Sequence, residues 1–206
     1  MSGLNVLFIG NSYTQANDLP GTVQLMVASR GGAMRHEVIA RGGALLHAHL
    51  AEGVARTRIH SGGLTHVVLQ EQSQLPAVAP PVFIEAACAL ADLATAAGAK
   101  PVLFVTWAPR DAPQEQAKIT ASYEAVARRT GALLAPVGPT WVKTEGLFRH
   151  LYGPDGRHPS PSGTYLAALV LFKALTGKAP VEMPVRPGVG PPMATMLEMI
   201  AAATDA

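Results

Sequence analysis

The sequence predicts an α/β fold in which a parallel sheet carries helices on both faces. Three observations predict it. The 206 residues and the 49% apolar composition suffice for one globular domain with a full core. Short apolar runs alternate with longer stretches of helical periodicity. Parallel neighbouring strands need crossover helices of that kind, so the alternation favours a parallel over an antiparallel sheet.

Each predicted element follows from this alternation. The short apolar runs predict strands at Asn5–Ile9, Glu37–Ala40, His66–Leu69, Pro101–Thr106 and Leu133–Pro136. Helical periodicity predicts helices over about Leu19–Ser29, Ala44–Arg58, Val82–Ala97, Gln114–Arg129 and Ser162–Leu175. Glycines at 31–32, 98, 131 and 177 fall where these helices should end. Ser160 before Pro161 fits an N-cap followed by proline at the first helical position.

We expect a single domain over residues 1–206, since the chain has no internal repeat and no linker. Its core should span about 4–177. The remainder, 178–206, comprises a Pro/Gly-rich extended connection over Ala179–Pro192 and a short closing helix over Met193–Ala203.

Composition excludes several classes of protein. A net charge of +2, with no long basic run, argues against nucleic-acid binding. No apolar run approaches the length of a membrane span, and no signal peptide is visible, so a cytoplasmic protein is expected unless a leader was removed. The single cysteine, Cys88, rules out an internal disulfide and fits a small core residue. The histidines at 36, 47, 49, 60, 66 and 150 form no metal-binding pattern, so neither a metal nor a cofactor is expected.

Polar and aromatic residues follow the predicted strands at one edge of the sheet. In open parallel sheets the functional site lies beyond the carboxyl ends of the strands. Ser12 follows the first strand, Gly42–Gly43 the second, Gln70–Gln74 the third and Trp107 the fourth. Asp155 and His158 lie on a late loop, after the fifth strand. Trp107 fits either packing or the lining of an acyl or sugar pocket.

Ser12, His158 and Asp155 are the three groups that activate a hydroxyl nucleophile. Serine is a weak nucleophile near neutral pH unless a base lies beside it and a third group orients that base. Ser12 lies in Gly10-Asn11-Ser12-Tyr13-Thr14, and the other two in Asp155-Gly156-Arg157-His158-Pro159. Taken singly, Ser12 could cap a helix, and Asp155 and His158 could be loop residues. The D-x-x-H spacing before the last long helix, together with Ser12, favours a catalytic triad.

These segments resemble the SGNH superfamily of serine hydrolases, also called GDSL esterases. Gly10-Asn11-Ser12 stands where the family has Gly-Asp-Ser, and the resemblance covers about residues 4–177. It implies a three-layer α/β/α sandwich with a five-stranded parallel sheet in flavodoxin-like order. It also implies that Ser12 is the nucleophile, His158 the base and Asp155 the residue that orients His158.

The resemblance further implies an oxyanion hole with three donors. The first two are the N–H of Ser12 and a glycine N–H after the second strand, for which Gly43 is preferred to Gly42. The third is an asparagine in the family, whereas this chain has Gln70-Glu71-Gln72-Ser73-Gln74. A glutamine amide is the same donor on a longer arm. Gln70 is the first candidate and Gln72 the second, and Gln74 stays open.

The implied activity is serine-dependent hydrolysis of a small-molecule or carbohydrate ester through an acyl-enzyme. Carbohydrate substrates rest on analogy with related branches that deacetylate sugars. One alternative is a flavodoxin-like cofactor binder, which would leave Asp155 and His158 without a role. Another is a catalytically inactive module that binds a sugar or a partner. The sequence leaves acyl length, natural substrate and oligomeric state open.

Overall fold

The computed structural model describes residues 3–184 and 186–204, and a sheet of parallel strands forms its centre. The strand order is β2-β1-β3-β4-β5, and every neighbouring pair is parallel. The strands are β1 Leu4–Gly10, β2 Met34–Ala40, β3 His66–Leu69, β4 Lys100–Phe104 and β5 Leu133–Ala135. The predicted fold class is therefore confirmed, as is the strand order that the resemblance implied.

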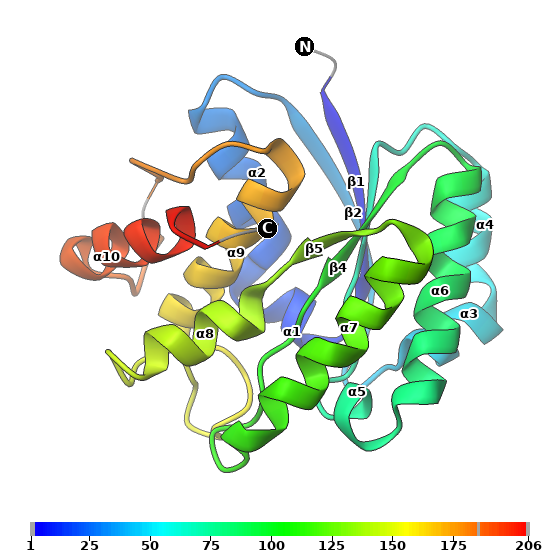
Figure 1. Cartoon of the computed structure of the whole chain (residues 1–206). Coiled ribbons are helices and arrows are strands. Elements are labelled where there is room, and N and C mark those ends of the chain that lie inside the picture. The colour runs from blue at the N-terminus through cyan, green and yellow to red at the C-terminus, as the bar shows by residue number, and fades with distance from the viewer. Residues whose placement is uncertain (1–2, 185, 205–206) are drawn as a thin grey trace.

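Helices cover both faces of this sheet, which is seen edge-on in Figure 1. On one face lie α2 Leu19–Ser29, α8 Val137–Glu145, α9 Pro161–Thr176 and α10 Pro191–Ala202. On the other lie α3 Leu46–Glu52, α4 Val54–His60, α6 Pro80–Ala96 and α7 Gln116–Thr130. The short helices α1 Ser12–Gln15 and α5 Leu75–Val78, with 3₁₀ turns at Ala16–Asp18 and Pro113–Glu115, complete the described elements. Among the described residues, none of these helices is long and apolar enough to cross a membrane.

Two apolar cores lie on either side of the sheet. Side chains alternate between the faces of a strand, so Phe8 of β1 packs toward α2 and α9. Its neighbours Leu7 and Ile9 pack toward α6 and α7. All three are fully buried, as expected for a central strand of a parallel sheet. The strand that delivers Ser12 is thus held on both faces.

Two element predictions need correction. The helix predicted over Ala44–Arg58 begins at Leu46 and is divided into α3 and α4 at Gly53, whose φ is 78°. That left-handed conformation ends an α-helix and suits glycine. Helix α8 was not predicted. By contrast, the ends at Gly131 and Gly177 and the Ser160 cap are confirmed.

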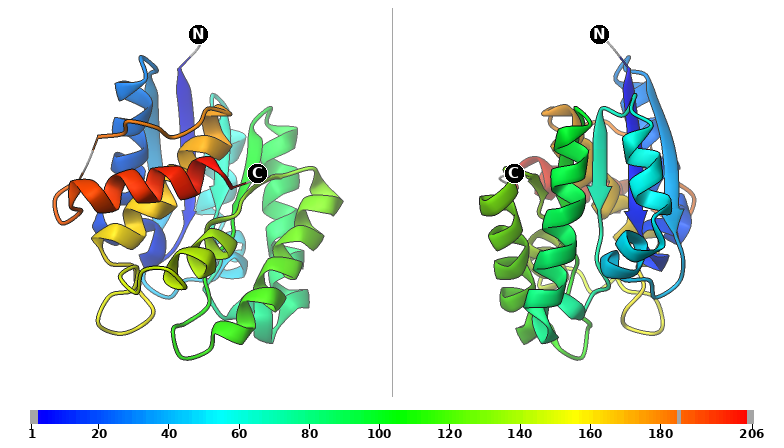
Figure 2. Two further views of the ribbon diagram at one scale, coloured as in Figure 1. Left: turned by 60° about the vertical axis from the view of Figure 1, so that its left-hand side comes forward. Right: turned by 90° about the vertical axis from the view of Figure 1, so that its right-hand side faces the viewer.

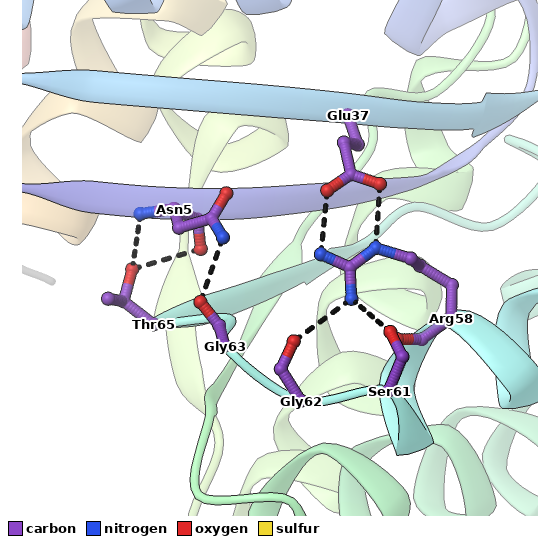
Figure 3. Close-up of polar contacts among 7 residues, drawn as sticks. All are labelled: Asn5, Glu37, Arg58, Ser61, Gly62, Gly63 and Thr65. Carbon is purple, nitrogen blue, oxygen red and sulfur yellow. Dashed lines mark hydrogen bonds and ion pairs between the residues drawn. The ribbon is translucent and has the colours of Figure 1, made fainter.

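Polar contacts fasten the end of α4 and the loop before β3 to β2 and β1 (Figure 3). The Arg58 guanidinium donates two hydrogen bonds of 2.6 Å to the Glu37 carboxylate on β2. The backbone N–H of Asn5 donates to Thr65 Oγ1 at 2.9 Å, and the Asn5 side chain donates to the Gly63 carbonyl at 2.8 Å. The Asn5 contacts lie at the amino end of β1, and Glu37 lies in the middle of β2. None of these contacts involves Ser12, so they support the sheet and leave the carboxyl edge free.

The C-terminal helix α10 packs on α9, and a buried carboxylate fixes it there. Glu198 accepts hydrogen bonds from the Tyr165 hydroxyl at 2.8 Å, from the Glu182 N–H at 2.7 Å and from the Met183 N–H at 3.1 Å. The predicted closing helix is therefore present, although it begins at Pro191.

The chain changes direction between β1 and β3, and this determines where the site lies. From β1 the chain moves outward to β2, then crosses back past β1 to β3. The crevice at such a reversal is where ligands bind in open parallel sheets. In both views of Figure 2 the long loop after α8 lies at the same end of the molecule as the carboxyl end of β1.

Packing of α9 against α8 should make Gly163 sensitive to substitution. A Cβ at Gly163 would overlap the Leu151 carbonyl oxygen and the Trp141 ring. We expect Gly163→Ala to lower the free energy of unfolding by about 2 kcal/mol or more, as overpacking does. Gly146→Ala is the matched control, because its Cβ would make only ordinary contacts and its φ of −62° suits alanine. Urea denaturation of both variants tests this, and equal stabilities would contradict it.

Candidate active site

Ser12 lies at the first turn after β1, at the carboxyl edge of the sheet. Asn11 precedes it and caps α1, since its side-chain oxygen accepts a hydrogen bond from the Tyr13 N–H at 3.1 Å. This cap places Ser12 at the first helical position, where its own N–H has no partner within the helix. Its hydroxyl lies 2.9 Å from His158 Nε2, although the two residues are 146 positions apart in the chain.

His158 and Asp155 form a compact unit on the loop after α8. His158 Nδ1 lies 2.5 Å from one carboxylate oxygen of Asp155. The other oxygen accepts the backbone N–H groups of Arg157 at 3.0 Å and His158 at 2.9 Å. These hydrogen bonds, that from His158 first, lower the Asp155 pKa to about 2. The carboxylate is therefore ionised at neutral pH, which favours the proton on Nδ1 and leaves Nε2 free to accept from Ser12.

A stack of aromatic rings supports this loop. Trp107 is fully buried between Tyr13 and Trp141, with ring centroids 4.6 and 3.9 Å away and nearly parallel planes. Its indole N–H donates to the Arg157 carbonyl at 2.9 Å, and the His158 ring meets Tyr13 edge-on at 5.3 Å. Of the two roles left open for Trp107, the structure favours packing, because Trp107 supports the backbone between Asp155 and His158.

The side chain of Gln70 is fully engaged in hydrogen bonds within the protein and does not line the hollow beside Ser12. It is fully buried, and its NH₂ donates to Asn11 Oδ1 at 3.0 Å and to the Glu71 carbonyl at 2.5 Å. Its oxygen accepts the Asn11 N–H at 3.0 Å and the Thr14 hydroxyl at 2.8 Å. Both donors are in use, so we correct the expectation that Gln70 is the third oxyanion donor: its amide joins β3 to the turn after β1.

Gln72 lies beside Ser12 instead. The two residues and Gly43 line a hollow of about 160 Å³, together with Asn11, Tyr13, Ser73, Arg157 and His158. The Gln72 oxygen accepts the N–H groups of Gln74 at 2.9 Å and Leu75 at 3.0 Å. Its NH₂ makes no hydrogen bond to any residue that the structure describes. Neither Gly42 nor Gln74 lines the hollow, so Gly43 and Gln72 are the better placed candidates for the second and third oxyanion donors.

A larger hollow of about 400 Å³ opens beside the amino end of β1, lined by Leu4, Val27, Phe172 and Lys178 among others. Neither Ser12 nor His158 lines it. In the described part of the chain no group of three or more His, Cys, Asp or Glu side chains could hold a metal ion. Ser12 and His158 instead line the smaller hollow of about 160 Å³.

Sequence reasoning missed two features of the site. Asn11 links three segments, because its side-chain NH₂ also donates to the Ala44 carbonyl at 3.1 Å, after β2. Glu71 is fully buried, and burial raises its pKa to about 7 although the N–H groups of Gln72 and Leu46 donate to it. A charged residue directly after an apolar strand was the available signal for Glu71.

The raised pKa of Glu71 predicts a pH dependence of stability. Between pH 4.5 and 7 the unfolded carboxyl has lost its proton while the folded one keeps it, so the unfolding free energy falls as pH rises. Relative to Glu71→Gln, the wild type should lose on the order of 3 kcal/mol across this window. Urea unfolding of both proteins at pH 4, 5, 6, 7 and 8 measures the difference. A difference that stays constant with pH would contradict the assignment.

Comparison with known proteins identifies the family. No family model and no curated protein matches the chain. A solved structure from Slackia heliotrinireducens, assigned to the SGNH hydrolases, is 32% identical, with a TM-score of 0.75 over 84% of this chain and 99% of that one.

Two further structures share the fold. A DUF4886 family protein from Bacteroides uniformis is 19% identical, with a TM-score of 0.77 over 98% of this chain and 94% of that one. The esterase EstA from Pseudoalteromonas sp., solved in a form inhibited by monoethylphosphonate, is 17% identical, with a TM-score of 0.66 over 84% and 97%. Given the fold, the site geometry and the 32% identity over nearly the whole of the first structure, the chain belongs to the SGNH hydrolases.

Proposed function

We propose that the chain is a serine esterase that hydrolyses short-chain acyl esters through an acyl-enzyme. The observation that carries the proposal is the continuous chain of contacts from Ser12 Oγ to His158 Nε2 at 2.9 Å and from His158 Nδ1 to Asp155 at 2.5 Å. Among the structural neighbours are an esterase and a lipase/acylhydrolase, which supports ester chemistry for this chain.

The proposed reaction has two halves. In the first, Ser12 Oγ attacks the ester carbonyl while His158 Nε2 takes the hydroxyl proton, and Asp155 stabilises the imidazolium. The tetrahedral intermediate collapses, the bond to the alcohol breaks, and His158 returns the proton to the leaving alkoxide. In the second half, His158 deprotonates a water that attacks the Ser12 ester. The bond to Ser12 Oγ breaks, His158 returns the proton to Oγ, and the carboxylic acid leaves.

The oxyanion would be held by the backbone N–H groups of Ser12 and Gly43 and by the side-chain amide of Gln72. Both Gly43 and Gln72 line the hollow beside Ser12, and the Gln72 oxygen is fixed by two backbone N–H groups. Removing one such donor typically lowers kcat by about 10²–10³-fold. We assign the third donor to Gln72 because both amide protons of Gln70 are already bound.

Short acyl groups are the proposed substrate class. The hollow beside Ser12 measures about 160 Å³, well below the roughly 300–1,000 Å³ of sites for drug-sized ligands. An acetyl group fits such a space, whereas a long chain would remain in solvent and gain little binding free energy. Acetylated carbohydrates are included by analogy with the family alone.

Substitutions of Ser12 and His158 should lower the rate by amounts that do not add. Ser12→Ala and His158→Ala should each lower kcat/KM for p-nitrophenyl acetate by about 10⁴-fold or more, and the double mutant should be little worse than either. Asp155→Asn should cost less, because it leaves the nucleophile and base in place. Steady-state kinetics of the four proteins tests this. Additive losses, or an active Ser12→Ala, would place the chemistry elsewhere.

A series of p-nitrophenyl esters of increasing acyl length tests the acyl preference. With p-nitrophenyl acetate, butyrate and octanoate, kcat/KM should fall with chain length, by about tenfold or more from acetate to octanoate, since a hollow of about 160 Å³ has no room to bury the added methylenes. A common leaving group keeps the intrinsic reactivity of the three esters similar. A rise in kcat/KM with chain length would show that another surface receives the acyl chain.

A further inference from the structure

Glu71 is a fully buried carboxylate that the proposed reaction does not use. No lysine, arginine or histidine among the described residues forms a salt bridge with it. Burying a carboxylate without a cationic partner is costly, and an apolar or amide side chain of similar size is often tolerated as well or better. Stability alone therefore does not explain a glutamate at this position.

The contacts of Glu71 join the two loops that carry the proposed oxyanion donors. One carboxylate oxygen accepts the Gln72 N–H at 2.6 Å and lies 3.3 Å from the Leu46 N–H, while the other oxygen lies 3.2 Å from the same Leu46 N–H. Leu46 begins α3, three residues after Gly43. The carboxylate thus spans from the loop after β2 to the loop after β3.

A third element fixes the backbone of Glu71. Its N–H donates to the Tyr123 hydroxyl at 3.1 Å, and Tyr123 is fully buried on α7, with its ring packed against Phe83. A residue of α7, outside the hollow beside Ser12, thereby fixes the backbone from which the Glu71 carboxylate extends. Three consecutive side chains thus reach three different places. Gln70 binds the turn after β1, Glu71 binds the loop after β2, and Gln72 lines the hollow beside Ser12.

We propose that Glu71 is a positioning residue for the oxyanion hole, whose carboxylate holds the backbone that bears Gly43 and Gln72 at a fixed separation. This rests on the proposed function. At pH 8, above the Glu71 pKa of about 7, the side chain is mainly ionised. A hydrogen bond to a charged acceptor is stronger than one to a neutral acceptor, so at that pH the carboxylate restrains both N–H groups more firmly than an amide would. The transition state needs the oxyanion donors at fixed positions. Its stabilisation should therefore depend on Glu71 more than substrate binding does.

Glu198 provides a matched control. Like Glu71, it is buried and its carboxylate accepts two backbone N–H groups. Its carboxylate further accepts the Tyr165 hydroxyl, and all its partners lie on α9 or the connection before α10. Glu71→Gln should lower kcat for p-nitrophenyl acetate by about tenfold or more while KM changes by less than about threefold. Glu198→Gln should leave kcat within about twofold of the wild type. Equal kcat in folded Glu71→Gln and wild type would overturn the proposal.

A double-mutant cycle tests how Glu71 acts. In a Gln72→Ala background the kcat loss from Glu71→Gln should shrink, because one of the donors it positions has gone. Fully additive losses would contradict positioning. If Glu71→Gln does not fold, Tyr123→Phe removes the hydroxyl that fixes Glu71 while keeping the packed ring, and it should lower kcat in the same direction. Unchanged kcat in Tyr123→Phe would then count against the proposal.

Hydrogen–deuterium exchange gives a readout that does not need activity. Glu71→Gln should raise exchange in peptides covering 42–46 and 71–75, and Glu198→Gln should not. Unchanged exchange in those peptides would overturn the positioning role even if the protein hydrolysed none of the esters. Hydrolysis by the wild type but not by Ser12→Ala, with unaltered exchange in Glu71→Gln, would overturn the positioning role and leave the esterase proposal standing.

Discussion

A buried pair of side-chain amides holds the site together. Gln70 accepts from the N–H of Asn11 and donates to its side-chain oxygen, and Asn11 in turn donates to the Ala44 carbonyl. Through these bonds the ends of β1 and β3 and the loop after β2 form one unit. A partly satisfied buried network would be costly, whereas here each amide group is bound. The geometry of Ser12, one residue beyond Asn11, depends on this pair.

The second half of the site reaches this unit from far along the chain. The loop with Asp155 and His158 is fixed by the Trp107 indole N–H and by the ring stack between Tyr13 and Trp141. Tyr13 follows Ser12 directly, so the same stack that supports the His158 loop also touches the turn after β1. Apolar packing and short hydrogen bonds therefore position Ser12 and His158 together.

The fold could be predicted from the sequence because its signals are local. Apolar runs, capping residues and terminal glycines each reflect the conformation of a few neighbouring residues, and the strand set and most helices followed from them. Helix α8 was missed because Gly138 and Pro139 near its start weakened the helical signal. Ser12, Asp155 and His158 could be predicted to lie together because serine activation requires three residue types, which this chain carries in two short segments, and the structure brings their side chains into contact. The direction of the Gln70 side chain was not predictable, since it depends on Asn11 and Thr14, which only the folded chain brings to it.

Covalent labelling of Ser12 tests the central claim most directly. An ethyl p-nitrophenyl phosphonate should react once per chain, with release of one p-nitrophenolate, and peptide mass spectrometry should place the phosphonyl group on Ser12. Ser12→Ala should take up no label, and His158→Ala should react far more slowly, because the base that activates the hydroxyl has been removed. A label on another residue, or no label in a protein that still hydrolyses p-nitrophenyl acetate, would contradict the assignment of Ser12 as the nucleophile.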